Sequence, residues 1–178
     1  MGEVPQQLDV DTTPVPNILP TGPVVYVANY AGGVFALDAE TGVQVWPNTA
    51  VSGVSDLTLW REPAHTRRDG GPPEPERTIL IASSGTTGLW GLDPETGREL
   101  WRRAVPSGGV SAPVPINGAL MMTASRLGIF LVSPLGGELI DGIHVADGTS
   151  MTPSAFGSRA FVMTNGGTFL SLTVTPPI

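Results

Sequence analysis

Four segments of the chain repeat one pattern, and this repetition constrains the fold more than any other feature. Each segment contains short apolar stretches separated by Gly, Pro, Asn and Asp, and each has an aromatic residue at the same place: Phe35, Trp90, Phe130 and Phe169. These residues are about 55, 40 and 39 positions apart, and a polar insertion at residues 61–77 accounts for the longer first interval. A unit of about 40 residues with four short strands is the size of a β-propeller blade.

The spacing therefore predicts an all-β protein, a β-propeller of about four four-stranded antiparallel blades. We expect the blades at residues 14–50, 51–106, 107–146 and 147–178, and the last has room for only three strands. Because an open sheet edge exposes unpaired backbone, a propeller must close. Two interpretations remain open. Residues 1–13 could supply a closing strand to a small four-bladed ring, or the chain is half of an eight-bladed ring, as a fragment or as one of two chains.

Composition excludes several classes of protein. Hydrophobic residues make up 40% of the chain and charged residues 14%, which is too apolar for a disordered chain. The net charge is −7 and the basic residues are nine Arg and no Lys, so a nucleic-acid-binding role is not expected. With no cysteine the chain has no disulfide and no thiolate metal site. No apolar run is long enough for a membrane helix, and the first residues resemble neither a signal peptide nor a lipobox.

Two turns repeat almost residue for residue, at positions 38–42 and 93–97. Asp38 and Asp93 open them, and the Asp side chain can accept hydrogen bonds from backbone N–H groups across a turn. Gly42 and Gly97 close them, where glycine supplies a positive φ that other residues tolerate poorly. We interpret both Asp residues as turn caps rather than metal ligands.

These turns belong to a longer string, aromatic-x-Leu-Asp-x-x-Thr-Gly-x-x-x-Trp, which runs from Phe35 to Trp46 and from Trp90 to Trp101. The string resembles the pyrroloquinoline-quinone-like propeller repeat. In that family the Trp docks against the neighbouring blade, which implies this role for Trp46 and Trp101. The third repeat departs from the pattern, because Ser133 replaces the Asp and no Trp follows near Ile140.

The whole chain most resembles the C-terminal half of BamB-type outer membrane protein assembly factors. That resemblance implies a non-catalytic scaffold at the periplasmic face of the outer membrane, which binds the barrel-inserting subunit. It implies no cofactor. Two alternatives stay open: a fragment of a quinone-dependent dehydrogenase, or a propeller that binds an unrelated peptide or glycan. The dehydrogenases use a calcium ion, a catalytic Asp and usually paired cysteines, and the chain has no cysteine.

Few residues suggest chemistry. Trp46, Trp90 and Trp101 are interpreted as packing between blades rather than stacking on a ligand. His65 and His144 are far apart in the sequence, so we do not expect a shared metal or acid–base site. Long loops often carry function, and the insertion holds four of the nine Arg. A solvated loop is the simpler interpretation, and partner contact through His65, Arg67 and Arg68 is the sharper one.

Overall fold

A computed structural model describes residues 12–66, 70–105 and 109–175. Every regular element in these residues is a β-strand, and the strands form four antiparallel sheets in which neighbours along the chain pair with one another. The all-β propeller architecture predicted from the repeats is therefore confirmed. No helix in these residues is long and apolar enough to cross a membrane.

Each sheet is one blade, and its strands are numbered in chain order. Blade 1 is β1 (Val15–Leu19), β2 (Gly22–Asn29), β3 (Gly33–Asp38) and β4 (Gln44–Asn48). Blade 2 is β5 (Val54–Glu62), β6 (Arg77–Ser84), β7 (Gly88–Leu92) and β8 (Glu99–Arg103). Blade 3 is β9 (Val114–Ile116), β10 (Ala119–Ala124), β11 (Gly128–Val132) and β12 (Leu139–His144). Blade 4 is β13 (Ser154–Phe156), β14 (Arg159–Met163) and β15 (Phe169–Thr173).

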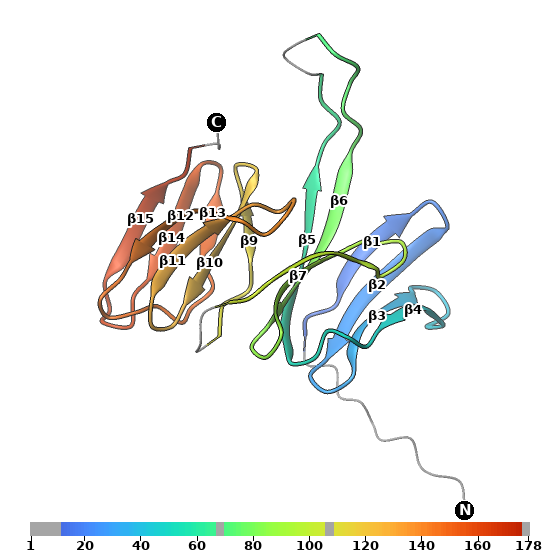
Figure 1. Ribbon diagram of the computed structural model, residues 1–178, viewed down its shortest axis with the longest axis horizontal. Helices are drawn as coiled ribbons and strands as arrows, with labels where there is room; N and C mark the ends of the chain where they lie inside the picture. Colours follow the sequence, from blue (N-terminus) through green and yellow to red (C-terminus); the bar gives the residue numbers. More distant parts are fainter. Residues whose placement is uncertain (1–11, 67–69, 106–108, 176–178) are drawn as a thin grey trace, which may run out of the picture.

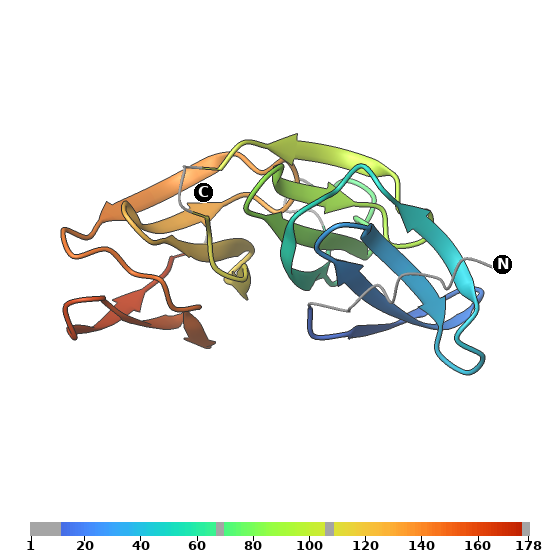
Figure 2. The same ribbon diagram turned by 90° about the horizontal axis from the view of Figure 1, so that it is seen from below.

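The blades are arranged as an arc, with consecutive blades side by side (Figures 1 and 2). Blades 1 and 4 lie at the two ends of the arc, so the described residues do not form the small four-bladed ring that the sequence left open. The closing strand suggested within residues 1–13 falls almost entirely outside the described residues. Residues 14–50, 51–106, 107–146 and 147–178 each contain the strands of one sheet.

The hydrophobic core lies between the blades rather than within them. Along β2, Val24, Tyr26 and Ala28 face blade 2 and join one cluster of buried side chains with Leu80 and Trp90. Because successive side chains of a strand point to opposite faces, a blade with a neighbour on each side is apolar on both faces. This is why the inner strands are continuous apolar runs instead of alternating ones.

Tryptophan and glycine fasten each of the first two blades to the next. The indole N–H of Trp46 donates to the carbonyl of Pro94 at 3.1 Å, and the indole ring lies against Gly97. The indole N–H of Trp101 donates to the carbonyl of Pro134 at 2.9 Å, and its ring lies against Gly137. The fourth strand of one blade is thereby seated on the last turn of the following blade.

The turns between the third and fourth strands of blades 1, 2 and 3 share one backbone hydrogen-bond pattern, although only those of blades 2 and 3 receive an indole ring. The carboxylate of Asp38 accepts from the N–H groups of Glu40 and Thr41 and from the Thr41 hydroxyl. These bonds, that of the Thr41 side chain foremost, hold the pKa of Asp38 below its usual value. Ser133 opens the third turn with the same backbone bonds, and its N–H donates to Glu138 at 2.8 Å.

The insertion is shorter than the sequence suggested. Arg61 and Glu62 still belong to β5, and Arg77 begins β6, with Glu62 paired to Arg77. The apolar pattern ends before the strands do, because backbone pairing in an antiparallel hairpin does not require apolar side chains. What was expected as a loop is in part an extension of the hairpin.

Gly97 and Gly42 allow the Trp–Gly contact to be tested, because both have φ near +70°. A methyl group at Gly97 would collide with the Trp46 ring, whereas one at Gly42 would meet nothing within 4 Å. We expect Gly42→Ala to lower the free energy of unfolding by about 1 kcal/mol through backbone strain alone. Gly97→Ala should lower it by about 2–4 kcal/mol, because the strain adds to displacement of the indole. Urea denaturation measures both, and equal losses would contradict the proposed docking.

Candidate functional site

The hairpin of β5 and β6 extends beyond the other strands at one end of the blades (Figure 1). Its two strands remain joined past Glu62 and Arg77 by an isolated bridge, in which His65 and Glu74 exchange N–H to carbonyl hydrogen bonds of 3.1 and 2.8 Å. Arg77 forms an ion pair with Glu74 at 2.7 Å, on the flank of the same extension. We call residues 62–77 the hairpin tip.

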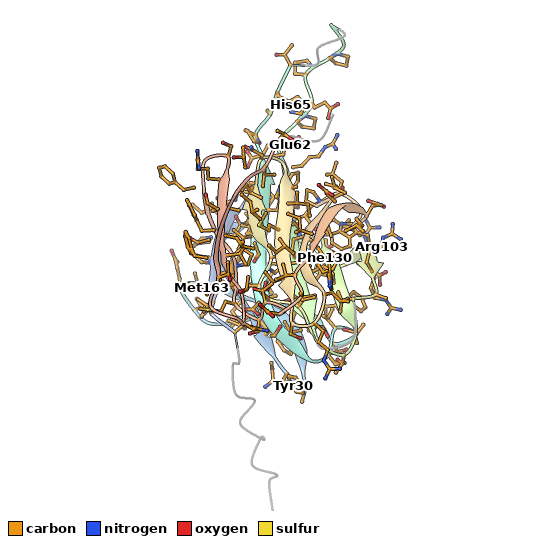
Figure 3. The ribbon with its side chains drawn as sticks, turned by 90° about the vertical axis from the view of Figure 1, so that its left-hand side faces the viewer. Tyr30, Glu62, His65, Arg103, Phe130 and Met163 are labelled. Carbon is orange, nitrogen blue, oxygen red and sulfur yellow. The ribbon has the colours of Figure 1, made fainter. Side chains whose placement is uncertain are left out.

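His65 is the one predicted contact residue that the structure describes, because Arg67 and Arg68 lie outside the described residues. Its ring nitrogens lie 4.0 Å from carboxylate oxygens of Glu62 and Glu74, and 46% of its side chain is exposed. His65 and Glu62 lie at the end of the molecule from which the tip projects, and Tyr30 lies at the opposite end (Figure 3). A protonated imidazole here would sit between two carboxylates at the surface.

A groove of about 840 Å³ lies between the base of the tip and the turns of blades 1 and 2. We call it the blade-1 groove. Its charges are mixed, with Arg61 and Arg77 facing Glu76, Asp93 and Glu95. Its remaining lining is mostly apolar and backbone: Asn17, Ile18, Leu19, Pro20, Thr78, Ile79, Pro94 and Leu100.

A continuous hydrogen-bond network runs from the lining of this groove to the buried Tyr26 directly beneath it, and we call this network the groove floor. The guanidinium of Arg61 donates to the side-chain oxygen of Asn17 at 2.7 Å, and the Asn17 amide donates to the Tyr26 hydroxyl at 3.0 Å. Tyr26 in turn donates to the carbonyl of Pro94 at 2.9 Å, the same carbonyl that accepts from Trp46. The network therefore ties the groove to the junction between blades 1 and 2.

Burial controls the titration of Tyr26. Its side chain is fully buried, and loss of hydration raises its pKa above the usual 10.0, although the Asn17 hydrogen bond and the Arg61 charge oppose the shift. The phenol therefore stays protonated at neutral pH and acts as a hydrogen-bond donor to Pro94. This makes Tyr26 a structural element of the groove floor.

A second groove, of about 500 Å³, lies on the other side of the tip, which we call the blade-3 groove. It is bounded by Trp60, Glu62 and His65 on the hairpin and by short turns at Asn117 and Gly157 on blades 3 and 4. The tip thus stands between two grooves that open at the same end of the molecule. Mixed charge, exposed apolar side chains and open ends suit an extended polypeptide segment better than a compact small molecule.

The other predicted residues are distributed through the scaffold. Trp46 and Trp101 lie at blade junctions, and Trp90 is buried in the cluster between blades 1 and 2. His144 ends β12, where its ring contacts the Leu127 carbonyl, on a different blade from His65. The described residues contain no group of three or more His, Cys, Asp or Glu that could hold a metal ion.

The residues of the groove floor were not predicted from the sequence. Asn17 and Tyr26 lie in strands that are otherwise apolar, and they come together only because β1 pairs with β2. The signal that could have found them is a polar group at an inward-facing position of each strand, since buried polar groups need partners.

Comparison with known proteins gives consistent matches. A family model described as outer membrane protein assembly factor BamB matches residues 49–151, more than half of the chain. Two proteins with that name, from Legionella pneumophila and Pseudomonas aeruginosa, are each 25% identical over 174 residues. The match covers 97% of this chain and 40% of each relative, so the chain spans less than half of their length.

Solved structures share the fold. BamB from Moraxella catarrhalis superposes with a TM-score of 0.64 and 19% identity, over 97% of this chain and 45% of that protein. The computationally designed Ika4 protein superposes with a TM-score of 0.68 and 13% identity, over 98% of this chain and all of the designed one.

Tyr26 gives the groove floor a measurable pH dependence. The chain has two tyrosines and neither lysine nor cysteine, so tyrosine is the only side-chain type expected to titrate between about pH 9.5 and 12. Since the folded-state pKa of Tyr26 is raised, the unfolded chain loses this proton first, and stability should fall as pH rises above about 10.

We expect Tyr26→Phe to reduce this alkaline loss of stability, and to cost about 1–2 kcal/mol at neutral pH through its lost hydrogen bonds. Urea denaturation at pH 7, 9, 10 and 11 measures both effects. Tyr30→Phe is the matched control and should retain the alkaline loss. The same pH profile in both variants would contradict the assignment.

Proposed function

The chain belongs to the family of the outer membrane protein assembly factor BamB, and on that premise we propose that it is a non-catalytic scaffold for β-barrel protein assembly. The proposed site of action is the periplasmic face of the outer membrane. The proposed partner is the barrel-inserting subunit of the assembly machinery, through its periplasmic domains.

The observation that carries this proposal is the family match over residues 49–151, which includes the hairpin tip and all strands of blades 2 and 3. The named relatives are outer membrane protein assembly factors. We infer that this chain assists assembly by holding other proteins. The wide, mixed-charge surface around the tip supports such a role, because it offers a partner both polar and apolar contacts.

Within this proposal, the hairpin tip and its two grooves form the partner-binding surface. The tip is held at its base by eight paired positions between β5 and β6, so it presents His65 and its neighbours from a fixed support. Fixed support lowers the entropy lost when a partner binds. The grooves on either side let a strand or loop of the partner lie along the tip.

Removal of the tip tests this surface. Because Glu62 and Arg77 face each other across the hairpin, residues 63–76 can be replaced by Asn-Gly, a two-residue hairpin turn. We expect this variant to bind the purified periplasmic domains of the barrel-inserting subunit at least about tenfold more weakly, a loss of about 1.4 kcal/mol or more. Biolayer interferometry with the immobilised partner measures the change.

Tyr30→Ala is the control, because Tyr30 lies at the opposite end of the blades (Figure 3). It should bind as the unaltered chain does. Circular dichroism and the unfolding midpoint should show that the shortened variant keeps its fold. Unchanged affinity after tip removal would show that the hairpin tip is not the binding surface. No binding by the folded, unaltered chain would contradict the scaffold proposal.

A further inference from the structure

Every internal junction between blades uses the same four positions. On the second and third strands of a blade, two cross-strand pairs face the preceding blade, and their side chains enter the cluster between the two blades. We call these four positions the docking quartet. The quartets of blades 2, 3 and 4 are, in order, Leu80, Ala82, Trp90 and Leu92; Leu120, Met122, Phe130 and Val132; Ala160, Val162, Leu170 and Leu172. Leu170 therefore takes the place of Trp90 and Phe130, and the alignment of Phe169 with them was wrong by one residue, which places Phe169 on the opposite face.

In the part of the chain that the structure describes, blade 1 carries an equivalent quartet with no blade in front of it. The same register gives the pairs Val25–Leu37 and Val27–Phe35 on β2 and β3. In blade 2 all four positions are fully buried, whereas Val25, Phe35 and Leu37 of blade 1 are only partly buried. Beside them, Ile18 on the same face of β1 is 82% exposed. Blade 1 therefore presents an apolar docking face to the outside of the arc.

At the other end of the arc, blade 4 exposes the face that in blades 1, 2 and 3 packs on the following blade. The apolar side chains of β14 and β15 that point away from blade 3 are Phe161, Met163 and Phe169, with Phe156 of β13 on the same face. Arg159, Ser171 and Thr173 share this face toward its other end. Phe156 is 82% exposed, Phe169 is 61% exposed, and the rings of Phe161 and Phe169 stack at 5.8 Å. Large exposed apolar patches on soluble proteins mark interaction surfaces.

These two faces are the two halves of one blade junction. Each blade has one face toward the preceding blade and one face toward the following blade. In each internal junction, the face toward the following blade packs on the docking quartet of that following blade. Among the described residues, the face of blade 4 that would point toward a following blade packs on no other blade, and blade 1 has a quartet that no other blade covers. They cannot meet within one copy, because blades 1 and 4 lie at opposite ends of the arc (Figure 2).

We propose that two copies of the chain form a closed ring of eight blades, with blade 4 of each copy packed on blade 1 of the other. This contact joins different surfaces, so copies add head to tail, and a ring closes only when the rotation per copy divides a full turn. Two four-blade arcs close a ring of eight blades when each arc turns through half of it. A second copy is the occupant that we propose, because each exposed face is equivalent to a face that fills the internal junctions.

Length agrees with this arrangement. One copy spans 45% of the solved BamB chain from Moraxella catarrhalis, so two copies approach the extent of that one chain. The proposal goes beyond the scaffold function and does not depend on it. A monomer would leave the partner-binding surface at the hairpin tip untouched.

Mass in solution tests the proposal directly. Light scattering coupled to size exclusion should give about 37 kDa, twice the 18.5 kDa of one chain. A monomer at micromolar concentration would overturn the proposal and leave the two faces for other blades, such as those of a longer polypeptide. A ladder of larger species would overturn closure of the ring.

Variants on the two faces test which surfaces meet. Val25→Lys on blade 1 and Phe169→Glu on blade 4 should each give monomers, because both junctions of a dimer then carry a desolvated charge. A mixture of the two variants should recover dimer, because one junction is then unaltered and the other combines both changes. Isolated monomers in the mixture would contradict head-to-tail pairing. Thr96→Lys, on the exposed turn of blade 2, is the control and should remain dimeric.

Cross-linking gives a second measurement that does not rely on disruptive charges. The chain has no cysteine, so Val25→Cys and Phe169→Cys each introduce the only thiol of the variant chain. With a short bismaleimide, a mixture of the two variants should give a covalent dimer, and neither variant alone should do so efficiently. Efficient dimer from one variant alone would indicate a symmetric face-to-face contact and overturn the head-to-tail ring.

Discussion

The packing of one blade on the next is the interaction on which the rest of the structure depends. A single blade is a small twisted sheet with apolar side chains on both faces, so it cannot bury its own core. The clusters between blades supply that core, and Trp46 and Trp101 fix the distance between neighbours by donating to a carbonyl of the next blade. The glycine in the receiving turn is required because a side chain there would occupy the space of the indole ring.

The hairpin tip shows how a repeat protein can acquire a specific surface without disturbing its core. β5 and β6 pair beyond the apolar region, and the chain between them carries polar and charged residues that need no interior. The network from Arg61 through Asn17 to Tyr26 connects the base of this extension to the junction between blades 1 and 2. The groove floor and the junction are therefore stabilised by the same buried hydroxyl.

Much of the fold could be predicted from the repeats. The string from Phe35 to Trp46 and its copy from Trp90 to Trp101 predicted the blade type, and the family match confirms that resemblance. Ser133 illustrates why the third blade also folds in this way: the backbone bonds of the turn survive the loss of the Asp, and Gly137 still receives Trp101. The predicted insertion, residues 61–77, was too long. Arg61 and Arg77 belong to paired strands, but they are polar, so no hydrophobic pattern in the sequence indicates that the strands continue there.

The sequence by itself determined the blade, because each blade is a local unit whose turns, strand lengths and apolar positions lie within about 40 residues. It could not determine the curvature of the arc, since that depends on the angle at which Trp46 and Trp101 seat one blade on another. Nor could it bring Arg61, Asn17 and Tyr26 together, because Asn17 and Tyr26 meet through the pairing of β1 with β2, and Arg61 reaches Asn17 only across the junction between blades 1 and 2. Only the tertiary structure showed that the first and last blades leave complementary apolar faces at opposite ends of the arc.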